Sequence, residues 1–340
     1  MLKASTVERS TCFDRRSVLQ FALGAWMPLV SLAQVPGRVY RLGLLHPGTM
    51  PAPGDAAALD WILGPLRALG YVEGQNLIVA RRYAGDQTDR LPAFARELVE
   101  LDVDTIFAVS SASIQAAMSA TTKVPIVFLS NGDPVAAGLV PSLAKTGSNV
   151  TGVLIAPEGS LTSKRVELLT QAVHQPRRIG LLAPSRPTVF GQQQVDEARS
   201  AARTLGLEIS VANVEGGNYA AAFAALAAAR CQALVVLADS MFLRDRKKII
   251  EQAAEHKLPA IYEWSRQVSD GGLISYGANE SETYKQVASY IDRIFEGTQP
   301  SDLPIWQPHR LQLTINLKTA RALGLSIPQS LLLGADELIR

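Results

Sequence analysis

Short apolar runs alternate with longer helical stretches over most of the chain, and the alternation occurs in two series. The apolar runs are continuous stretches of Val, Ile and Leu, which indicates strands buried on both faces. The first series predicts strands over 39–45, 76–82, 105–109, 125–129 and 150–155, with helices over 55–69, 91–100 and 113–120. The second predicts strands over 179–183, 208–214, 233–237 and 259–262, with helices over 195–205, 219–230 and 244–256.

Repeated strand–helix units predict parallel sheets with right-handed crossovers. Two such series predict an α/β fold with two doubly wound parallel-sheet lobes. The break falls near residues 156–159, where Pro157 and Gly159 suit a connection better than a helix interior. The two series have a similar alternation of strands and helices, but their sequences do not repeat at the level of individual residues.

The first 33 residues differ from the rest and are typical of an export signal peptide. Arg15 and Arg16 precede an apolar run over 18–30, and the run is followed by Ser-Leu-Ala at 31–33. The run is too short for a membrane span of about 20 residues. We expect cleavage near Ala33 and a soluble protein that works in the periplasm.

The adjacent arginines favour export by the twin-arginine (Tat) route. An ordinary Sec signal, in which two positive charges happen to be neighbours, is the alternative reading. Cys12 lies before the apolar run and no cysteine directly follows Ala33, so we do not expect a lipoprotein anchor.

Composition argues against a polyanionic partner. The chain has 33 Lys and Arg against 31 Asp and Glu, for a net charge of +2, and the two signs are interspersed. We therefore expect no nucleic-acid partner.

The length after the predicted signal suits two domains. Cys231 lies between an Ala-rich helix and an apolar strand, which is typical of a buried structural thiol.

Motifs for catalysis, cofactors and metals are missing. The sequence has no G-x-x-x-x-G-K-[ST] loop, no G-x-G-x-x-G after the first strand, and no His-x-x-His, Cys-x-x-Cys or G-x-S-x-G. We expect no catalytic residue, no cofactor and no metal. His46 differs from the other histidines because it directly follows the first strand, where open α/β sheets bind ligands. His46 is therefore a binding candidate.

Small polar residues follow the strands of the first series. Ser110 and Ser111 come between a strand and a helix, where hydroxyls and free backbone N–H groups can hold a carboxylate or another anion. Simple N-capping explains the same residues. Asp133 precedes Pro134, and a capping role is favoured there over ligand contact.

The second series places Asp239 after one strand, Tyr262 at the end of the next, and Tyr276 after a further apolar run. Acidic, hydroxyl and aromatic groups thus converge where two lobes could face each other. Such a lining suits a small polar or zwitterionic solute.

Several motifs closely resemble the ABC-importer substrate-binding proteins of the tryptophan/tyrosine type. The similarity is strongest in Gly271-Gly272-Leu273-Ile274-Ser275-Tyr276-Gly277, in 302–308 (DLPIWQP), and in 313–320 with 323–328. It extends to 125–128, 132–140, 149–153, 164–169, 258–262 and 334–337. The resemblance covers the chain from about Arg41 to its end.

The resemblance implies a type I periplasmic-binding-protein fold with hinge crossovers and a ligand between the lobes. The expected lobes are 38–156 with about 277–300, and 157–276 with about 301–340. It implies ligand contacts at Ser110, Ser111, Asp133, Asp239 and Tyr276. The family usually has Gly with a Thr or Ser where this chain reads Ser110-Ser111-Ala112.

The implied function is the periplasmic substrate-binding component of an ABC importer, not an enzyme. Its expected partners are a small amino-acid-like or aromatic solute and the importer's permease subunits, and we expect a monomer. Two alternatives stay open: a ligand-sensing periplasmic domain, and an exported α/β enzyme.

Overall fold

The computed structural model describes residues 37–50, 60–156, 161–185 and 188–340. The elements below all lie in one unit, Val39–Arg340. The predicted signal peptide lies outside the described residues, as does the beginning of the helix expected at 55–69.

The first sheet is fully parallel, with strand order β2-β1-β3-β4-β5. Its strands are β1 (Tyr40–His46), β2 (Leu77–Tyr83), β3 (Thr105–Val109), β4 (Ile126–Ser130) and β5 (Val150–Leu154). β4 and β5 are buried at every position, as the continuous apolar runs predicted. Register is set by pairs such as Leu42 with Val79 and, at the carboxyl ends, His46 with Tyr83.

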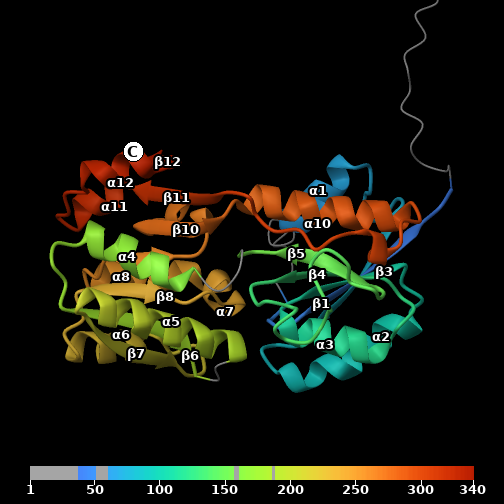
Figure 1. Ribbon diagram of the computed structural model, residues 1–340, viewed down its shortest axis with the longest axis horizontal. Helices are drawn as coiled ribbons and strands as arrows, with labels where there is room; N and C mark the ends of the chain where they lie inside the picture. The colour runs from blue at the N-terminus through green and yellow to red at the C-terminus, as the bar shows by residue number, and fades with distance from the viewer. Residues whose placement is uncertain (1–36, 51–59, 157–160, 186–187) are drawn as a thin grey trace, which may run out of the picture. The chain divides into compact units, whose positions relative to one another are not determined.

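Helices cover both faces of this sheet (Figure 1). α1 (Asp60–Ala68) and α10 (Glu280–Phe295) pack on one face, while α2 (Leu91–Glu100) and α3 (Ser111–Ala120) pack on the other; the short η2 (Thr88–Arg90) precedes α2. Alternate residues of a strand pack into separate hydrophobic cores on the two faces of the sheet: Phe107 packs with α1, and Ile106 packs with α2 and α3. The sheet is therefore doubly covered, as right-handed crossovers require.

The second sheet has the order β12-β11-β10-β9-β8-β6-β7. Its strands are β6 (Arg178–Pro184), β7 (Glu208–Val214), β8 (Ala233–Val236), β9 (Ala260–Tyr262), β10 (Ile274–Ala278), β11 (Leu311–Asn316) and β12 (Glu337–Ile339). Only the pairing of β10 with β11 is antiparallel; the others are parallel.

One hydrophobic core runs through this second sheet and its helices. The helices are α4 (Thr162–Ala172), α5 (Val189–Leu205), α6 (Tyr219–Ala228), α7 (Ser240–Arg244), α8 (Arg246–Glu255), α9 (Ser265–Ser269), α11 (Leu317–Ala322) and α12 (Gln329–Gly334). α4 packs with α5, and α6 packs with α8 (Figure 1). The helix expected at 244–256 is confirmed as α8, and the short α7 that precedes it was not predicted.

The chain passes between the two sheets three times. It leaves the first sheet after β5, returns when β10 is followed by α10, and leaves again after Trp306. The short η3 (Pro300–Asp302) and Trp306 still lie against β5, so the second sheet resumes only at β11. The exact lobe boundaries stay a prediction.

Within residues 37–50, 60–156, 161–185 and 188–340, no helix combines the length and the apolar character that crossing a membrane would need.

Candidate functional site

The two sheets share the topology that places a binding site. The first begins 2-1-3-4, and the second repeats this order with β7-β6-β8-β9. In such doubly wound sheets ligands bind at the carboxyl ends of the strands, where the strand order reverses. Those points lie between β1 and β3 and between β6 and β8. His46 ends β1, Ser110 follows β3, and Asp239 follows β8.

Serine hydroxyls gather at the carboxyl ends of β3 and β4. The Oγ atoms of Ser111 and Ser130 lie 3.4 Å apart, and Ser130 Oγ accepts the Gly132 N–H at 3.1 Å. Ser110 and Ser113 hold buried hydroxyls that have no hydrogen-bond partner in the described part of the chain. We call Ser110, Ser111, Ser113 and Ser130 the serine cluster.

Ser110 has a backbone that serine rarely adopts. Its φ is 80° and its ψ 156°, a region populated almost only by glycine, and holding another residue there costs on the order of 1–3 kcal/mol. Its side chain does not cap α3. The first N–H groups of a helix have no partner within the helix, so the start of α3 combines free donors with unpartnered hydroxyls. This arrangement can accept a carboxylate.

His46 is the last residue of β1, and β1 lies next to β3, the strand that leads into the serine cluster. Its Nδ1 accepts the Gly48 N–H at 3.0 Å, and its ring lies 5.2 Å from that of Tyr83, centroid to centroid. Burial lowers the pKa of His46 to about 4; the Asp86 carboxylate acts in the opposite direction and Arg244 in the same one. His46 is therefore neutral near pH 7.

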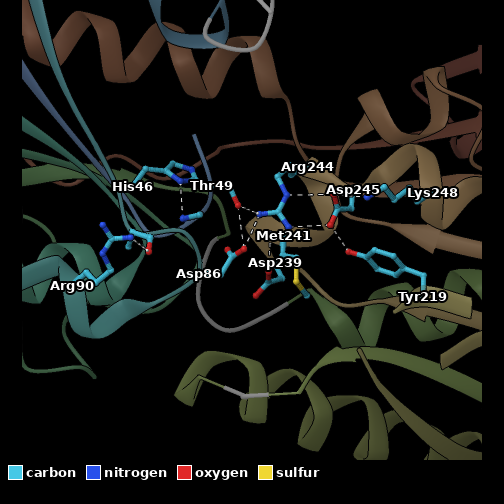
Figure 2. A network of polar contacts seen from close by, with 12 residues as sticks. His46, Thr49, Asp86, Arg90, Tyr219, Asp239, Met241, Arg244, Asp245 and Lys248 are labelled. Atoms are coloured by element: carbon cyan, nitrogen blue, oxygen red, sulfur yellow. Dashed lines mark hydrogen bonds and ion pairs between the residues drawn. The ribbon is translucent and has the colours of Figure 1, made fainter. Parts of the chain in front are cut away.

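Charged groups gather at the carboxyl end of β8 and in α7 (Figure 2). Asp239 caps α7 by accepting the Met241 N–H at 2.8 Å, and burial raises the pKa of Asp239 above its usual value. Arg244 is held by Asp245, with 3.0 Å between Nη2 and Oδ2, and Asp245 also accepts the Tyr219 hydroxyl at 2.8 Å.

Arg244 also reaches the loops that follow β1 and β2. Its Nη1 donates to Thr49 Oγ1 at 2.7 Å and to Asp86 Oδ2 at 2.8 Å, as Figure 2 shows. Burial acts to lower the pKa of Arg244, but Asp245 and Asp86 outweigh it and raise that pKa above its usual value. We call Thr49, Asp86 and Arg244 the clasp, because they link the loops of the first sheet to α7 of the second.

A buried network forms a second link between the sheets. Asn131 Nδ2, after β4, donates to Glu263 Oε1 at 2.8 Å, and Arg165 Nη2 lies 3.7 Å from the same oxygen. Arg165 Nε donates to the backbone carbonyl of Tyr276 at 2.9 Å. Burial raises the pKa of Glu263 to about 7 and lowers that of Arg165. A side chain at Gly277 would come within 2.3 Å of the Glu263 carbonyl, so only glycine fits there.

The predicted site residues separate into two groups. The structure places His46, Ser110 and Ser111 at neighbouring strand ends of the first sheet, and Asp239 at the corresponding end of the second. Tyr276 lies in β10 against the core, half-buried, with its backbone carbonyl on Arg165.

Asp133 and Tyr262 lie elsewhere. Asp133 is exposed and accepts the N–H groups of Val135 and Ala136 at 2.8 and 3.2 Å, so its capping role is confirmed, although residues 134–138 form turns and not a regular helix. Tyr262 is 1% exposed and packs in the core of the second sheet. Neither is kept in the candidate site.

Sequence reasoning missed Thr49, Asp86, Arg165, Arg244 and Glu263. Asp86 and Arg244 are 158 positions apart, and nothing local marks them as partners. Thr49 and Glu263 did carry a usable clue, because each follows a strand just as His46 and Asp239 do. In the described residues, no three His, Cys, Asp or Glu side chains are grouped so that they could hold a metal ion.

The sequence profile of the ABC transporter substrate binding protein family matches residues 50–339. The chain belongs to this family. Such proteins bind a small-molecule solute and work with ABC transporter components, and the family consists of binding proteins that are not enzymes. Among curated proteins, this substrate-binding protein is 26% identical to a tyrosine-binding protein from Clostridioides difficile (strain R20291) over 75% of this chain and 73% of that one.

Solved structures have the same fold. A conserved domain protein from Vibrio cholerae is 25% identical, with a TM-score of 0.75, over 88% of this chain and 100% of that chain. The ABC domain from Streptococcus pneumonia in complex with L-Trp is 23% identical, with a TM-score of 0.74, and the match also covers 88% of this chain and 100% of that chain. The fold expected from the sequence, that of the type I periplasmic binding proteins, is confirmed.

Proposed function

We propose that this chain is the solute-binding component of an ABC importer and that it captures an amino acid, preferably an aromatic one, outside the cytoplasmic membrane. The solute lies between the carboxyl ends of the two sheets, and the lobes close on it by a hinge motion. The permease subunits then recognise the closed form. A relative that binds tyrosine and a neighbour that holds L-Trp support this choice of solute.

The observation that carries the proposal is the pair of buried hydroxyls at the start of α3, those of Ser110 and Ser113, which have no hydrogen-bond partner in the part of the chain that the structure describes. A buried polar group without a partner is costly, and native proteins keep few of them. A solute carboxylate would supply acceptors for these hydroxyls and for the free N–H groups of the helix. The strained backbone of Ser110 agrees, because such strain gathers at binding sites.

The amino group of the solute is assigned to the acidic edge of the second sheet. Asp239 and Glu263 follow neighbouring strands, and burial raises the pKa of both carboxyl groups. An ammonium group placed between them would offset the cost of burying their charges. A zwitterion thus matches the donors of the first edge and the carboxylates of the second.

Calorimetry of the full chain with three related compounds tests the proposal. L-Tyrosine carries both charged groups, tyramine lacks the carboxylate, and N-acetyl-L-tyrosine lacks the ammonium. We expect tyrosine to bind and each analogue to lose at least tenfold in affinity. If all three bind equally, or if no amino acid binds while some substrate is turned over, the proposed function is wrong.

Two variants tell the ends of the solute apart. Asp239→Asn should weaken the binding of tyrosine and of tyramine, which both carry the ammonium group, and leave the affinity for N-acetyl-L-tyrosine unchanged. Ser113→Ala should weaken the binding of tyrosine and N-acetyl-L-tyrosine, which carry the carboxylate, and leave the affinity for tyramine unchanged. Asp133→Asn is the matched control, because Asp133 is exposed and caps a turn. It should change stability by less than about 1 kcal/mol and leave affinity as it is.

Export through the predicted signal peptide is part of the same proposal. Replacing Arg15 and Arg16 by lysine should stop export by the Tat route and leave Sec export largely intact. Fractionation of cells that express the full chain distinguishes the routes. A protein that stays in the cytoplasm with its natural arginines would contradict a periplasmic function.

A further inference from the structure

Tyr83 holds a polar atom that the fold itself does not use. Its hydroxyl is buried and has no hydrogen-bond partner in the described part of the chain. Burial raises the pKa of Tyr83 to about 12, so the group stays a neutral O–H that can donate and accept. The carboxylate of Asp86, three residues later, is engaged by Arg244 and Thr49 instead.

His46 presents a second neutral donor beside it. A backbone N–H can only donate, so the Nδ1 atom that accepts from Gly48 carries no proton. The proton of the neutral ring is therefore on Nε2, and within the described residues the hydrogen bond of the His46 side chain is the one that Nδ1 accepts. With a pKa of about 4, His46 keeps this tautomer throughout the neutral range.

The two groups form one row. His46 and Tyr83 are register partners at the carboxyl ends of β1 and β2, so their side chains leave the sheet on the same face. Ser110 follows β3, on the other side of β1. Adjacent strands lie ~4.8 Å apart, which places the strand of Tyr83 roughly 10 Å from the strand of Ser110. An aromatic amino acid is about as long as this separation.

We propose that His46 and Tyr83 form a neutral subsite for an uncharged oxygen atom at the far end of the solute side chain. This inference rests on the proposed function, in which the serine cluster holds the solute carboxylate. A phenol oxygen accepts from His46 Nε2–H and exchanges a second hydrogen bond with the Tyr83 hydroxyl. An indole offers only an N–H, which the Tyr83 hydroxyl can accept but which leaves the His46 Nε2–H without an acceptor, and a phenyl ring offers neither group. The subsite therefore selects tyrosine over tryptophan and phenylalanine.

The test is calorimetry of the full chain with L-tyrosine, L-phenylalanine and L-tryptophan. One or two extra hydrogen bonds correspond to a preference of roughly 3- to 30-fold for tyrosine over phenylalanine. Tyr83→Phe should reduce this ratio several-fold by lowering only the affinity for tyrosine. His46→Asn should do the same, because asparagine keeps an acceptor for the Gly48 N–H but does not reach the position of Nε2.

Tyr290→Phe is the matched control. It also removes one buried tyrosine hydroxyl from the first lobe, but that hydroxyl donates to the Pro304 carbonyl at 2.6 Å. The control should melt at a lower temperature and keep the tyrosine-to-phenylalanine ratio. Tyr83→Phe should show the reverse, with an unchanged or higher melting temperature and a lower ratio, because it removes a hydroxyl that the free protein leaves unpartnered.

The outcomes separate the two proposals. If tyrosine and phenylalanine bind equally to the natural protein, or if Tyr83→Phe and His46→Asn leave the ratio unchanged, the subsite is wrong while amino-acid binding stands. If none of the three amino acids binds, the proposed function fails and the subsite fails with it.

Discussion

The carboxyl edges of the two sheets share a strand order but differ in chemistry. The edge of the first sheet carries neutral groups, namely the serine cluster, His46 and Tyr83, and several of their polar atoms have no partner among the described residues. The edge of the second carries charges that largely satisfy one another, such as Arg244 with Asp245 and Arg165 with Glu263. The same topology thus provides a mostly neutral edge on one side and a charged edge on the other; in the proposed function the first binds the solute carboxylate and the second binds its ammonium group.

This difference predicts opposite responses to mutation. Where polar atoms have partners, removing one leaves another buried group uncompensated, and stability falls. Where a polar atom has no partner in the free protein, removing it costs little stability, and any loss appears in solute affinity. The predictions below test this contrast, beginning with the largest expected effect.

Arg165→Met should destabilise the second edge most. Arg165 is 2% exposed, and its removal leaves the buried carboxyl of Glu263 without its cation. Breaking a buried pair in this way costs about 3–5 kcal/mol. Urea unfolding at pH 8 measures the loss. The double variant Arg165→Met with Glu263→Gln is the control and should recover most of it; a double variant no better than the single one would show that Arg165 acts mainly through Tyr276.

Acid titration should reveal the neutral character of the first edge. The pKa of His46 falls from 6.5 to about 4 on folding, so the unfolded chain binds a proton more readily between these values. The stabilisation from His46 is therefore complete above about pH 6.5 and is lost as pH falls toward 4, a difference of up to about 3 kcal/mol.

Comparison with His46→Asn isolates this effect from the carboxyl groups that titrate in the same range. Urea unfolding at pH 7 and pH 4.5 should show a steeper loss for the natural protein than for the variant. Glu263, whose pKa is raised to about 7, acts in the opposite direction and is present in both proteins, so it cancels. Parallel losses would mean that His46 is charged in the folded protein.

Ser110→Gly should stabilise the free protein and weaken solute binding. Glycine adopts φ 80° and ψ 156° without strain, which removes a cost on the order of 1–3 kcal/mol, less about 0.5–1 kcal/mol for its greater freedom when unfolded. Thermal unfolding and calorimetry with tyrosine measure the two effects. Ser111→Gly is the control for the effect on stability alone, because Ser111 begins α3 without a positive φ and glycine there should lower the melting temperature. A destabilised Ser110→Gly would contradict the strain.

The sequence predicts the sheets better than it predicts the site. Continuous apolar runs mark the buried strands β3, β4 and β5 of the first sheet, because a strand covered on both faces has no polar side. The same property hides side-chain direction, so Tyr262 looked like a ligand wall at a strand end although it packs against Gly272 inside the core. The positive φ of Ser110 could not be predicted, because nothing in the residue type indicates it. The clasp depends on Asp86 and Arg244, which come together only through the tertiary fold.

Arg244→Gln should have the smallest effect and the most specific one. Arg244 and Asp86 are 37% and 42% exposed, so their ion pair contributes only about 0.2–1 kcal/mol. Because the clasp links the two edges, this contribution should appear in solute affinity and should weaken with salt, since the screening length falls from about 10 Å at 0.1 M to about 3 Å at 1 M. Arg246→Gln is the matched control: Arg246 pairs with Asp270 at 2.6 Å within the second lobe. Calorimetry with tyrosine at 0.05 M and 0.5 M salt should show a salt dependence that Arg244→Gln reduces and Arg246→Gln preserves. If both variants keep the natural salt dependence, the clasp is a surface contact that does not hold the lobes around the solute.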